Sequence, residues 1–65
     1  MEIKITEFIN IEGKQKFVVE EWDGWKPKPN QTIETYSTKI DAMEAAIEIG
    51  ATKEANFRIS YYKTS

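Results

Sequence analysis

Three carboxylates recur at helical spacing and are the first candidates for chemistry. Asp41, Glu44 and Glu48 fall on one narrow side of a helical wheel. Clustered carboxylate oxygens are the ligands that magnesium and calcium prefer. No oxygen-rich loop is expected to converge on them, so a solvated helix face is the better interpretation. The sequence therefore predicts no metal site.

A second acidic group, Glu20, Glu21 and Asp23, could supply a carboxylate pair for acid or base catalysis. The chain contains no histidine and no cysteine. The usual general base at neutral pH, the thiol nucleophile and the usual zinc ligands are therefore missing. A chain of 65 residues also leaves little room for a deep pocket. We predict a protein that is not an enzyme and uses no cofactor.

Basic and aromatic residues form a third pattern. If the strands that carry them are neighbours, one sheet face combines Lys16, Trp22, Arg58 and Tyr62. Mixed faces of this kind stack single-stranded bases. The net charge of −2 opposes the salt-dependent attraction that usually dominates affinity for nucleic acid. Nucleic-acid binding is therefore the alternative to a protein partner.

The segment Trp22-Asp23-Gly24-Trp25 carries two large aromatic side chains around an Asp-Gly pair. Asp-Gly between apolar flanks predicts a tight hairpin turn, with the indoles at or beside its tip. We expect at least one indole to pack over the open end of a helix–sheet core. The other is expected to anchor an interface, because tryptophan and tyrosine often concentrate binding energy.

Alternating apolar residues predict two strands that position these side chains. The alternation covers residues 3–11 and 16–22, with a turn at residues 12–14, so the two strands are expected to pair antiparallel. Glu7 interrupts the apolar row, which predicts a bulge or an edge. The prolines within residues 26–31 predict an extended loop or edge, because proline donates no backbone hydrogen bond.

The second half of the chain predicts a short strand, a helix and a closing strand. Residues 32–36 form the short strand, and Thr38 followed by Asp41 resembles a capping box. The helix is expected to begin at Lys39 and to stop at Gly50, with small alanines that let it lie close to a sheet. Residues 57–62 alternate again and predict the last strand.

These elements define an α+β fold in the order β-β-β-α-β. We predict one domain over residues 1–65, with a three- to four-stranded antiparallel sheet and one helix packed on one face. The other face is left for solvent, a ligand or a second copy of the chain. The first residues contain no long apolar run, so neither a signal peptide nor a membrane span is expected, and we predict a cytoplasmic location.

Two segments, residues 22–25 and residues 38–46, resemble a small uncharacterised prokaryotic family with an Asp-Gly-Trp hairpin, a threonine-capped helix and a closing strand. That resemblance spans residues 17–62 and implies a fold without an established activity. Residues 17–50 are more faintly similar to the arm-binding domain of tyrosine recombinases, whose three-stranded sheet reads DNA. This sheet has fewer basic residues than that family, and a strand follows the helix.

We therefore expect a small, non-enzymatic interaction module. It would bind a protein partner through the sheet face away from the helix and through the hairpin tip, in the role of a regulator or inhibitor. The residues expected to carry the contact are Trp22, Trp25, Arg58, Tyr62 and Lys16. The partner could also be a second copy of the chain, giving a homodimer.

Overall fold

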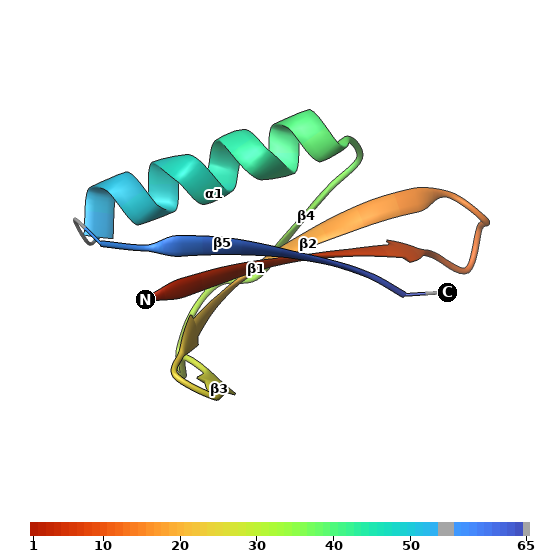
Figure 1. Ribbon diagram of the computed structural model, residues 1–65. Coiled ribbons are helices and arrows are strands. Elements are labelled where there is room, and N and C mark those ends of the chain that lie inside the picture. Colours follow the sequence, from red (N-terminus) through yellow and green to blue (C-terminus); the bar gives the residue numbers. More distant parts are fainter. Residues whose placement is uncertain (54–55, 65) are drawn as a thin grey trace.

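The computed structural model describes residues 1–53 and 56–64, which form a mixed sheet with one helix on one of its faces (Figure 1). The elements follow in the order β1 (Glu2–Ile9), β2 (Gln15–Asp23), β3 (Lys26–Pro27), β4 (Glu34–Tyr36), α1 (Lys39–Lys53) and β5 (Arg58–Lys63). The predicted α+β class is confirmed. The structure adds one short strand, β3, inside the segment predicted to be an extended edge.

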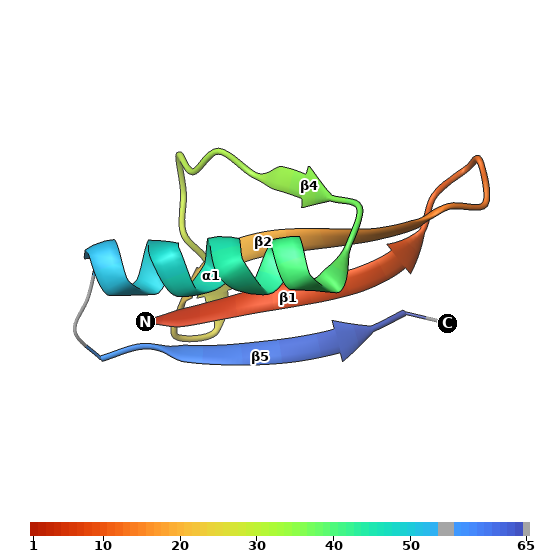
Figure 2. The ribbon, with the colours of Figure 1, turned by 90° about the horizontal axis from the view of Figure 1, so that it is seen from above.

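Strand β1 lies in the sheet between β2 and β5. It pairs antiparallel with β2, from Glu2 opposite Trp22 to Ile9 opposite Gln15. Strand β5 pairs parallel with β1, so the prediction of an antiparallel sheet is wrong for this strand. Helix α1 carries the chain back to the end of the sheet where β1 begins (Figure 2). A strand that starts after such a crossover runs parallel to its neighbour.

The outer edge of β2 is covered by two short strands and one side chain. Strand β3 pairs with Trp22 and Asp23, and β4 pairs with residues 17–19. Between them, the Gln31 amide accepts a hydrogen bond from the Glu21 backbone N–H at 2.8 Å and donates to the Glu21 carbonyl at 2.9 Å. The Gln31 side chain therefore replaces a strand partner where the paired strands leave a gap.

Gln31→Ala is expected to lower the free energy of unfolding by about 1 kcal/mol, because it removes the amide that satisfies the Glu21 backbone. Gln31→Glu is the matched control. Its carboxylate keeps the acceptor for the Glu21 N–H but loses both donors. Chemical denaturation should show that both variants are less stable than the parent, because in Gln31→Glu a carboxylate oxygen replaces the amide nitrogen that faces the carbonyl oxygens of Glu21 and Lys28. Faster amide exchange at Glu21 should accompany the alanine change, and unaltered exchange there would contradict this role.

The core is a single layer of side chains between the sheet and α1. Its buried members are Ile3, Ile5, Phe17, Val19, Ala42 and Ala46. Along β1 and β2 buried residues alternate with half-buried ones, as expected for strands with one covered face. On the helix, the small residues Ala42 and Ala46 are fully buried in this layer.

Helix α1 begins as predicted and ends later than predicted. The Thr38 hydroxyl accepts a hydrogen bond from the Asp41 backbone N–H at 3.2 Å, which is the expected N-cap. Gly50 does not stop the helix, which continues to Lys53. A Cβ at position 50 would overlap the Phe57 ring, so this glycine serves close packing and not helix termination.

The predicted turn between β1 and β2 is present, but the apolar row before it is shorter than expected. The Asn10 side chain accepts hydrogen bonds from the backbone N–H groups of Glu12 and Lys14 at 3.0 and 2.9 Å. Strand β1 ends at Ile9, and both Ile9 and Ile11 are exposed. These two isoleucines therefore contribute nothing to the core.

Candidate interaction surface

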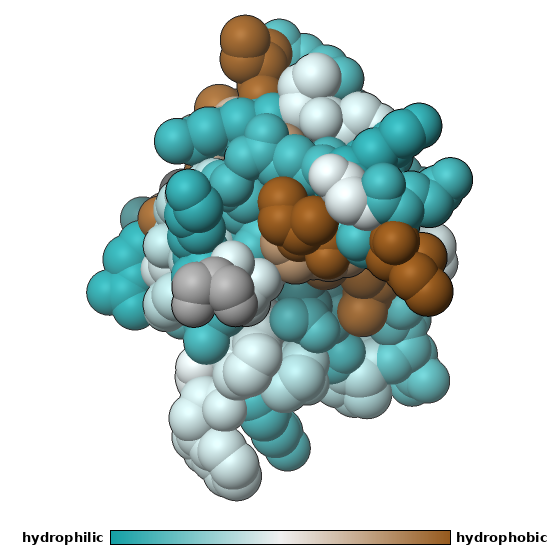
Figure 3. Space-filling view, turned by 90° about the vertical axis from the view of Figure 1, so that its right-hand side faces the viewer, coloured by the Kyte–Doolittle hydropathy of each residue, from teal (hydrophilic) through white to brown (hydrophobic). Residues whose placement is uncertain are grey.

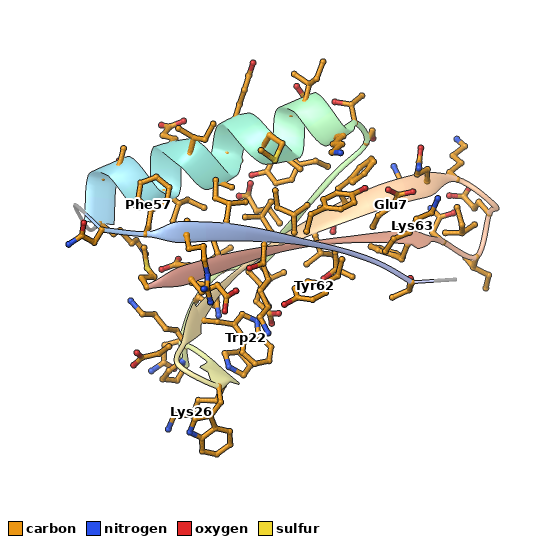
Figure 4. All side chains as sticks on the ribbon, viewed as in Figure 1. Glu7, Trp22, Lys26, Phe57, Tyr62 and Lys63 are labelled. Atoms are coloured by element: carbon orange, nitrogen blue, oxygen red, sulfur yellow. The ribbon has the colours of Figure 1, made fainter. Side chains whose placement is uncertain are left out.

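The face of the sheet away from α1 is built by the outward residues of three strands. We call it the outer sheet face. It comprises Glu2, Lys4, Thr6 and Phe8 of β1, Lys16, Val18, Glu20 and Trp22 of β2, and Arg58, Ser60 and Tyr62 of β5. Figure 4 shows Trp22 and Tyr62 below the sheet, on the side opposite the helix. None of the described helical residues covers this face.

A lysine between two aromatic rings occupies the middle of the outer sheet face. The Lys4 Nζ lies 3.5 Å from the centroid of the Trp22 ring and 5.3 Å from that of Tyr62. Such contacts contribute about 0.5–1 kcal/mol at exposed positions. The Trp22 indole N–H also donates to the Glu20 carboxylate at 2.8 Å. The cation and the carboxylate together fix how Trp22 is presented.

Beside this stack, Glu2 links β1 to β5. Its carboxylate accepts a short hydrogen bond from the Ser60 hydroxyl and lies 3.5 Å from the Arg58 guanidinium. The Ser60 hydroxyl, followed by the charges of Arg58 and Lys4, keeps the pKa of Glu2 below its usual value, against the opposing effect of desolvation. Glu2 is therefore charged at neutral pH, and it partly neutralises Arg58.

The structure brings together only some of the residues predicted to form the site. Trp22, Arg58 and Tyr62 share the outer sheet face near the Lys4 stack. Lys16 shares the face but lies six residues along β2 from Trp22, a distance of about 20 Å at the rise of an extended strand. Its ammonium donates to the Ser37 hydroxyl at 3.1 Å. Lys16 is therefore not part of the aromatic cluster.

Neither tryptophan packs into the core, so the expectation that at least one would do so is wrong. Trp22 is half-buried on the outer sheet face, where the strand alternation directs it away from α1. Trp25 is 86% exposed at the tip of the β2–β3 hairpin. Because Asp23 pairs with Lys26, the two-residue loop is Gly24–Trp25, and Gly24 takes the positive φ of 70° that a primed turn requires at this place.

The surface below the sheet is aromatic and polar, with few aliphatic atoms. In Figure 3 the part of the molecule below the sheet is mostly pale and teal, and the brown side chains lie mainly at the level of the sheet and the helix. Tyr62 is 47% exposed there. Aromatic side chains are enriched in protein interfaces, whose rim is polar.

Sequence reasoning missed Lys4 as a member of the site. Its position between Ile3 and Ile5 predicted only an outward side chain. Its partners come from β2 and β5, so the contact depends on the register of both pairings. The parallel pairing of β5 was not predicted, and without it Tyr62 could not be placed next to Lys4.

On the opposite face, Glu7 is a buried carboxylate that ties β5 to β1. It accepts short hydrogen bonds from the Tyr61 hydroxyl and the Gln15 amide, and it lies 3.9 Å from the Lys63 ammonium. The hydrogen bonds from Tyr61 and Gln15 hold the pKa of Glu7 below its usual value, although burial opposes this shift. The hydrogen bond between Tyr61 and Glu7 also raises the pKa of Tyr61 to about 12. The register of β1 is continuous through Glu7, so the predicted bulge or edge is wrong.

This bond makes stability depend on pH in two ranges. Because the pKa of Glu7 is lowered in the folded state, Glu7 contributes fully to the free energy of unfolding above pH 4.5. This contribution disappears as the pH falls through the lowered pKa. The raised pKa of Tyr61 means that its contribution is complete below pH 10.0 and disappears as the pH rises through about 12. Tyr61→Phe should weaken both dependences in thermal unfolding curves.

Tyr36→Phe is the control, because the pKa of Tyr36 is also raised but its hydroxyl donates to Glu34. That variant should keep the part of both dependences that comes from Glu7 and Tyr61. If the stability of Tyr61→Phe depended on acid and alkaline pH as in the parent, the Glu7–Tyr61 hydrogen bond would not contribute to that dependence.

The carboxylates considered for chemistry do not form a site in the described part of the chain. Glu20 and Glu21 point to opposite faces of β2, so they are not a carboxylate pair. Glu21 lies 3.0 Å from the Lys53 ammonium. Among residues 1–53 and 56–64, no group of three or more acidic side chains is arranged to hold a metal ion.

Comparison with known proteins adds no relative. No family model, curated protein or solved structure matches the chain. The helix of the described residues is too short and too polar to cross a membrane. The outer sheet face and the hairpin tip therefore remain the basis for a functional conclusion.

Proposed function

We propose that this chain is a small, non-enzymatic module that binds a protein partner through the outer sheet face and the tip of the β2–β3 hairpin. A role as a regulator or inhibitor in the cytoplasm belongs to the same proposal. The observation that carries it is the stack of Trp22, Lys4 and Tyr62 on a sheet face that α1 does not cover. Aromatic side chains that are already fixed by contacts within the chain lose little conformational entropy when a partner covers them.

The charges near the stack favour a protein over a nucleic acid. Lys4 lies over one face of each ring, where it competes with a base for stacking. Arg58 lies against Glu2, and Glu20 accepts from Trp22. A surface whose cations are matched by carboxylates offers little net attraction to phosphates.

Trp25 extends the proposed surface beyond the sheet. In Figure 1 the β2–β3 hairpin bends away from α1 and projects below the sheet, on the same side as the outer sheet face. A partner that rests on the Lys4 stack can therefore also contact Trp25 at the tip. An exposed indole on a short, tightly turned loop is a suitable anchor for such a contact.

Affinity capture from the native host tests the proposal. The parent chain is compared with a Trp22→Ala, Tyr62→Ala double variant, and Ile11→Ala serves as the control for loss of an exposed apolar side chain elsewhere. Removing aromatic anchors costs about 2 kcal/mol or more, which corresponds to about 30-fold weaker binding. The double variant should lose the captured protein and the control should keep it. A folded double variant that captures the same protein would contradict the proposal.

Titration with single-stranded oligonucleotides at several salt concentrations tests the alternative. Tryptophan fluorescence reports the result, because Trp22 lies in the proposed surface. Tight binding that weakens steeply with salt and quenches the fluorescence would favour nucleic acid. The proposal predicts no salt-dependent quenching.

A further inference from the structure

The outer edge of β5 is an open strand edge. Backbone N–H groups of Arg58 and Thr64 donate to Met1 and Glu7 at 3.1 and 3.0 Å, so the even-numbered residues of this strand bond toward β1. Because successive residues alternate, the N–H and C=O groups of Ile59, Tyr61 and Lys63 point away from β1. In Figure 2 β5 forms the rim of the sheet, and none of the described strands lies beyond it.

An apolar row on α1 lies on the same flank as this edge. The helix faces the sheet with Ala42, Ala46 and Gly50, and at 100° per residue Ile40, Met43 and Ile47 fall together on one flank. Ala45, Glu48 and Ile49 lie on the opposite flank, which adjoins β4. The first flank is therefore the one toward β5, where the Lys39 ammonium lies 4.3 Å from the Tyr61 ring. Ile40 is 70% and Ile47 49% exposed.

We propose that the open edge of β5 binds the β5 edge of a second copy of this chain. The two strands pair antiparallel about a two-fold axis that passes between the two copies of Ser60. Both sheets then join into one continuous sheet with both helices on the same side. The apolar rows of the two helices are on the flanks that are turned toward the paired strands.

The sequence of β5 is complementary to itself in this register. Ile59 lies opposite Tyr61 of the second copy, and Arg58 lies opposite Tyr62 of the second copy. Opposite residues of an antiparallel pair must both point their backbone groups outward or both inward. The backbone groups of Arg58 point toward β1, and those of Lys63 point away from it. These two cationic residues therefore cannot be opposite each other in any allowed register. Aromatic–aliphatic and cation–aromatic pairs across strands are favourable.

The pairing also extends the outer sheet face. Arg58 of one copy comes next to Tyr62 of the other, so the two aromatic clusters become parts of one surface. The inference does not depend on the proposed function, since the edge groups and the helix row lie outside the Lys4 stack. A dimer without a protein partner, and a partner without a dimer, are both possible results and are distinguishable.

Sedimentation equilibrium and cross-linking test the proposal. The parent chain should show a mass of twice 7.6 kDa at micromolar concentration. Ser60→Cys introduces the single thiol of the chain at the two-fold axis, where opposite Cα atoms are about 4.5 Å apart and within reach of a disulfide. Diamide, which accepts the two electrons and two protons released, should convert this variant to a covalent dimer at least ten-fold faster than Lys14→Cys at the exposed turn.

Ser60→Lys supplies the opposite result. It places two ammonium groups against each other across the axis, while within one copy the new ammonium lies next to Glu2. The mass should fall to 7.6 kDa with the circular dichroism spectrum preserved. A parent chain that stays monomeric at high micromolar concentration would overturn the proposal. So would a dimer in which Ser60→Cys cross-links no faster than Lys14→Cys.

Discussion

Ile5→Ala is expected to lower the free energy of unfolding by about 2–5 kcal/mol, the range for removing a large aliphatic side chain from a core. Ile5 is fully buried at the centre of the sheet, and few other large side chains share the single core layer. Because a folded chain of 65 residues is marginally stable, much of the population should be unfolded at 37 °C. Denaturant titration at low temperature measures the loss.

Ile11→Ala is the matched control for this prediction. The same chemical change is made at a side chain that is fully exposed on the turn between β1 and β2. Its effect should stay within about 0.5 kcal/mol. Equal losses at the two positions would mean that the core is not where the structure places it.

Gly50→Ala is expected to destabilise the fold by up to about 2 kcal/mol, although alanine is the better helix former. Alanine gains roughly 1 kcal/mol in a helix interior. A Cβ at position 50 would overlap the Phe57 ring, and forcing extra atoms into a packed contact costs about 1–3 kcal/mol. Figure 4 shows Phe57 beneath the C-terminal part of α1, where the chain leads into β5. Thermal or chemical unfolding gives the sign directly.

Ala51→Gly tests the same preference one residue further along the helix. Ala51 is exposed, so only helix propensity acts there, and glycine should cost about 1 kcal/mol. Glycine is thus favoured at position 50 and disfavoured at position 51. Stabilisation by Gly50→Ala would show that the Phe57 contact does not limit the packing of α1.

Local sequence patterns were sufficient for most of the secondary structure. The alternation of Ile3 and Ile5 with polar residues located β1, and the hydroxyl of Thr38 located the start of α1. Patterns of this range do not contain the direction of β5, which follows from how α1 crosses the sheet. They also predicted the wrong role for Gly50, because the residue type alone does not distinguish a glycine that ends a helix from one that packs against a ring.

The candidate site was predictable only as far as strand faces were. Alternation assigned Lys16 and Trp22 to one face of β2, and Arg58 and Tyr62 to one face of β5. The role of Lys4 required the register of three strands. The expectation that an indole packs over the core was wrong. The size of an apolar side chain does not determine the face of the sheet on which the strand places that side chain.

The two proposed surfaces have different chemistry and different consequences. The outer sheet face offers aromatic rings with matched charges, whereas the β5 edge offers unpaired backbone groups next to aliphatic side chains. If both are used, a dimer presents two copies of the Lys4 stack on one side of a continuous sheet. A partner with two-fold symmetry, or with two similar sites, would then bind with increased avidity.

Photo-cross-linking in the native host tests the central claim most directly. Benzoylphenylalanine replaces Tyr62 on the outer sheet face or Glu44, an exposed residue of the helix. We expect that position 62 forms a covalent adduct with a protein other than a second copy of this chain and that position 44 does not. Adducts of equal yield at position 44, or adducts from position 62 to nucleic acid alone, would contradict the assignment of the outer sheet face as a protein-binding surface.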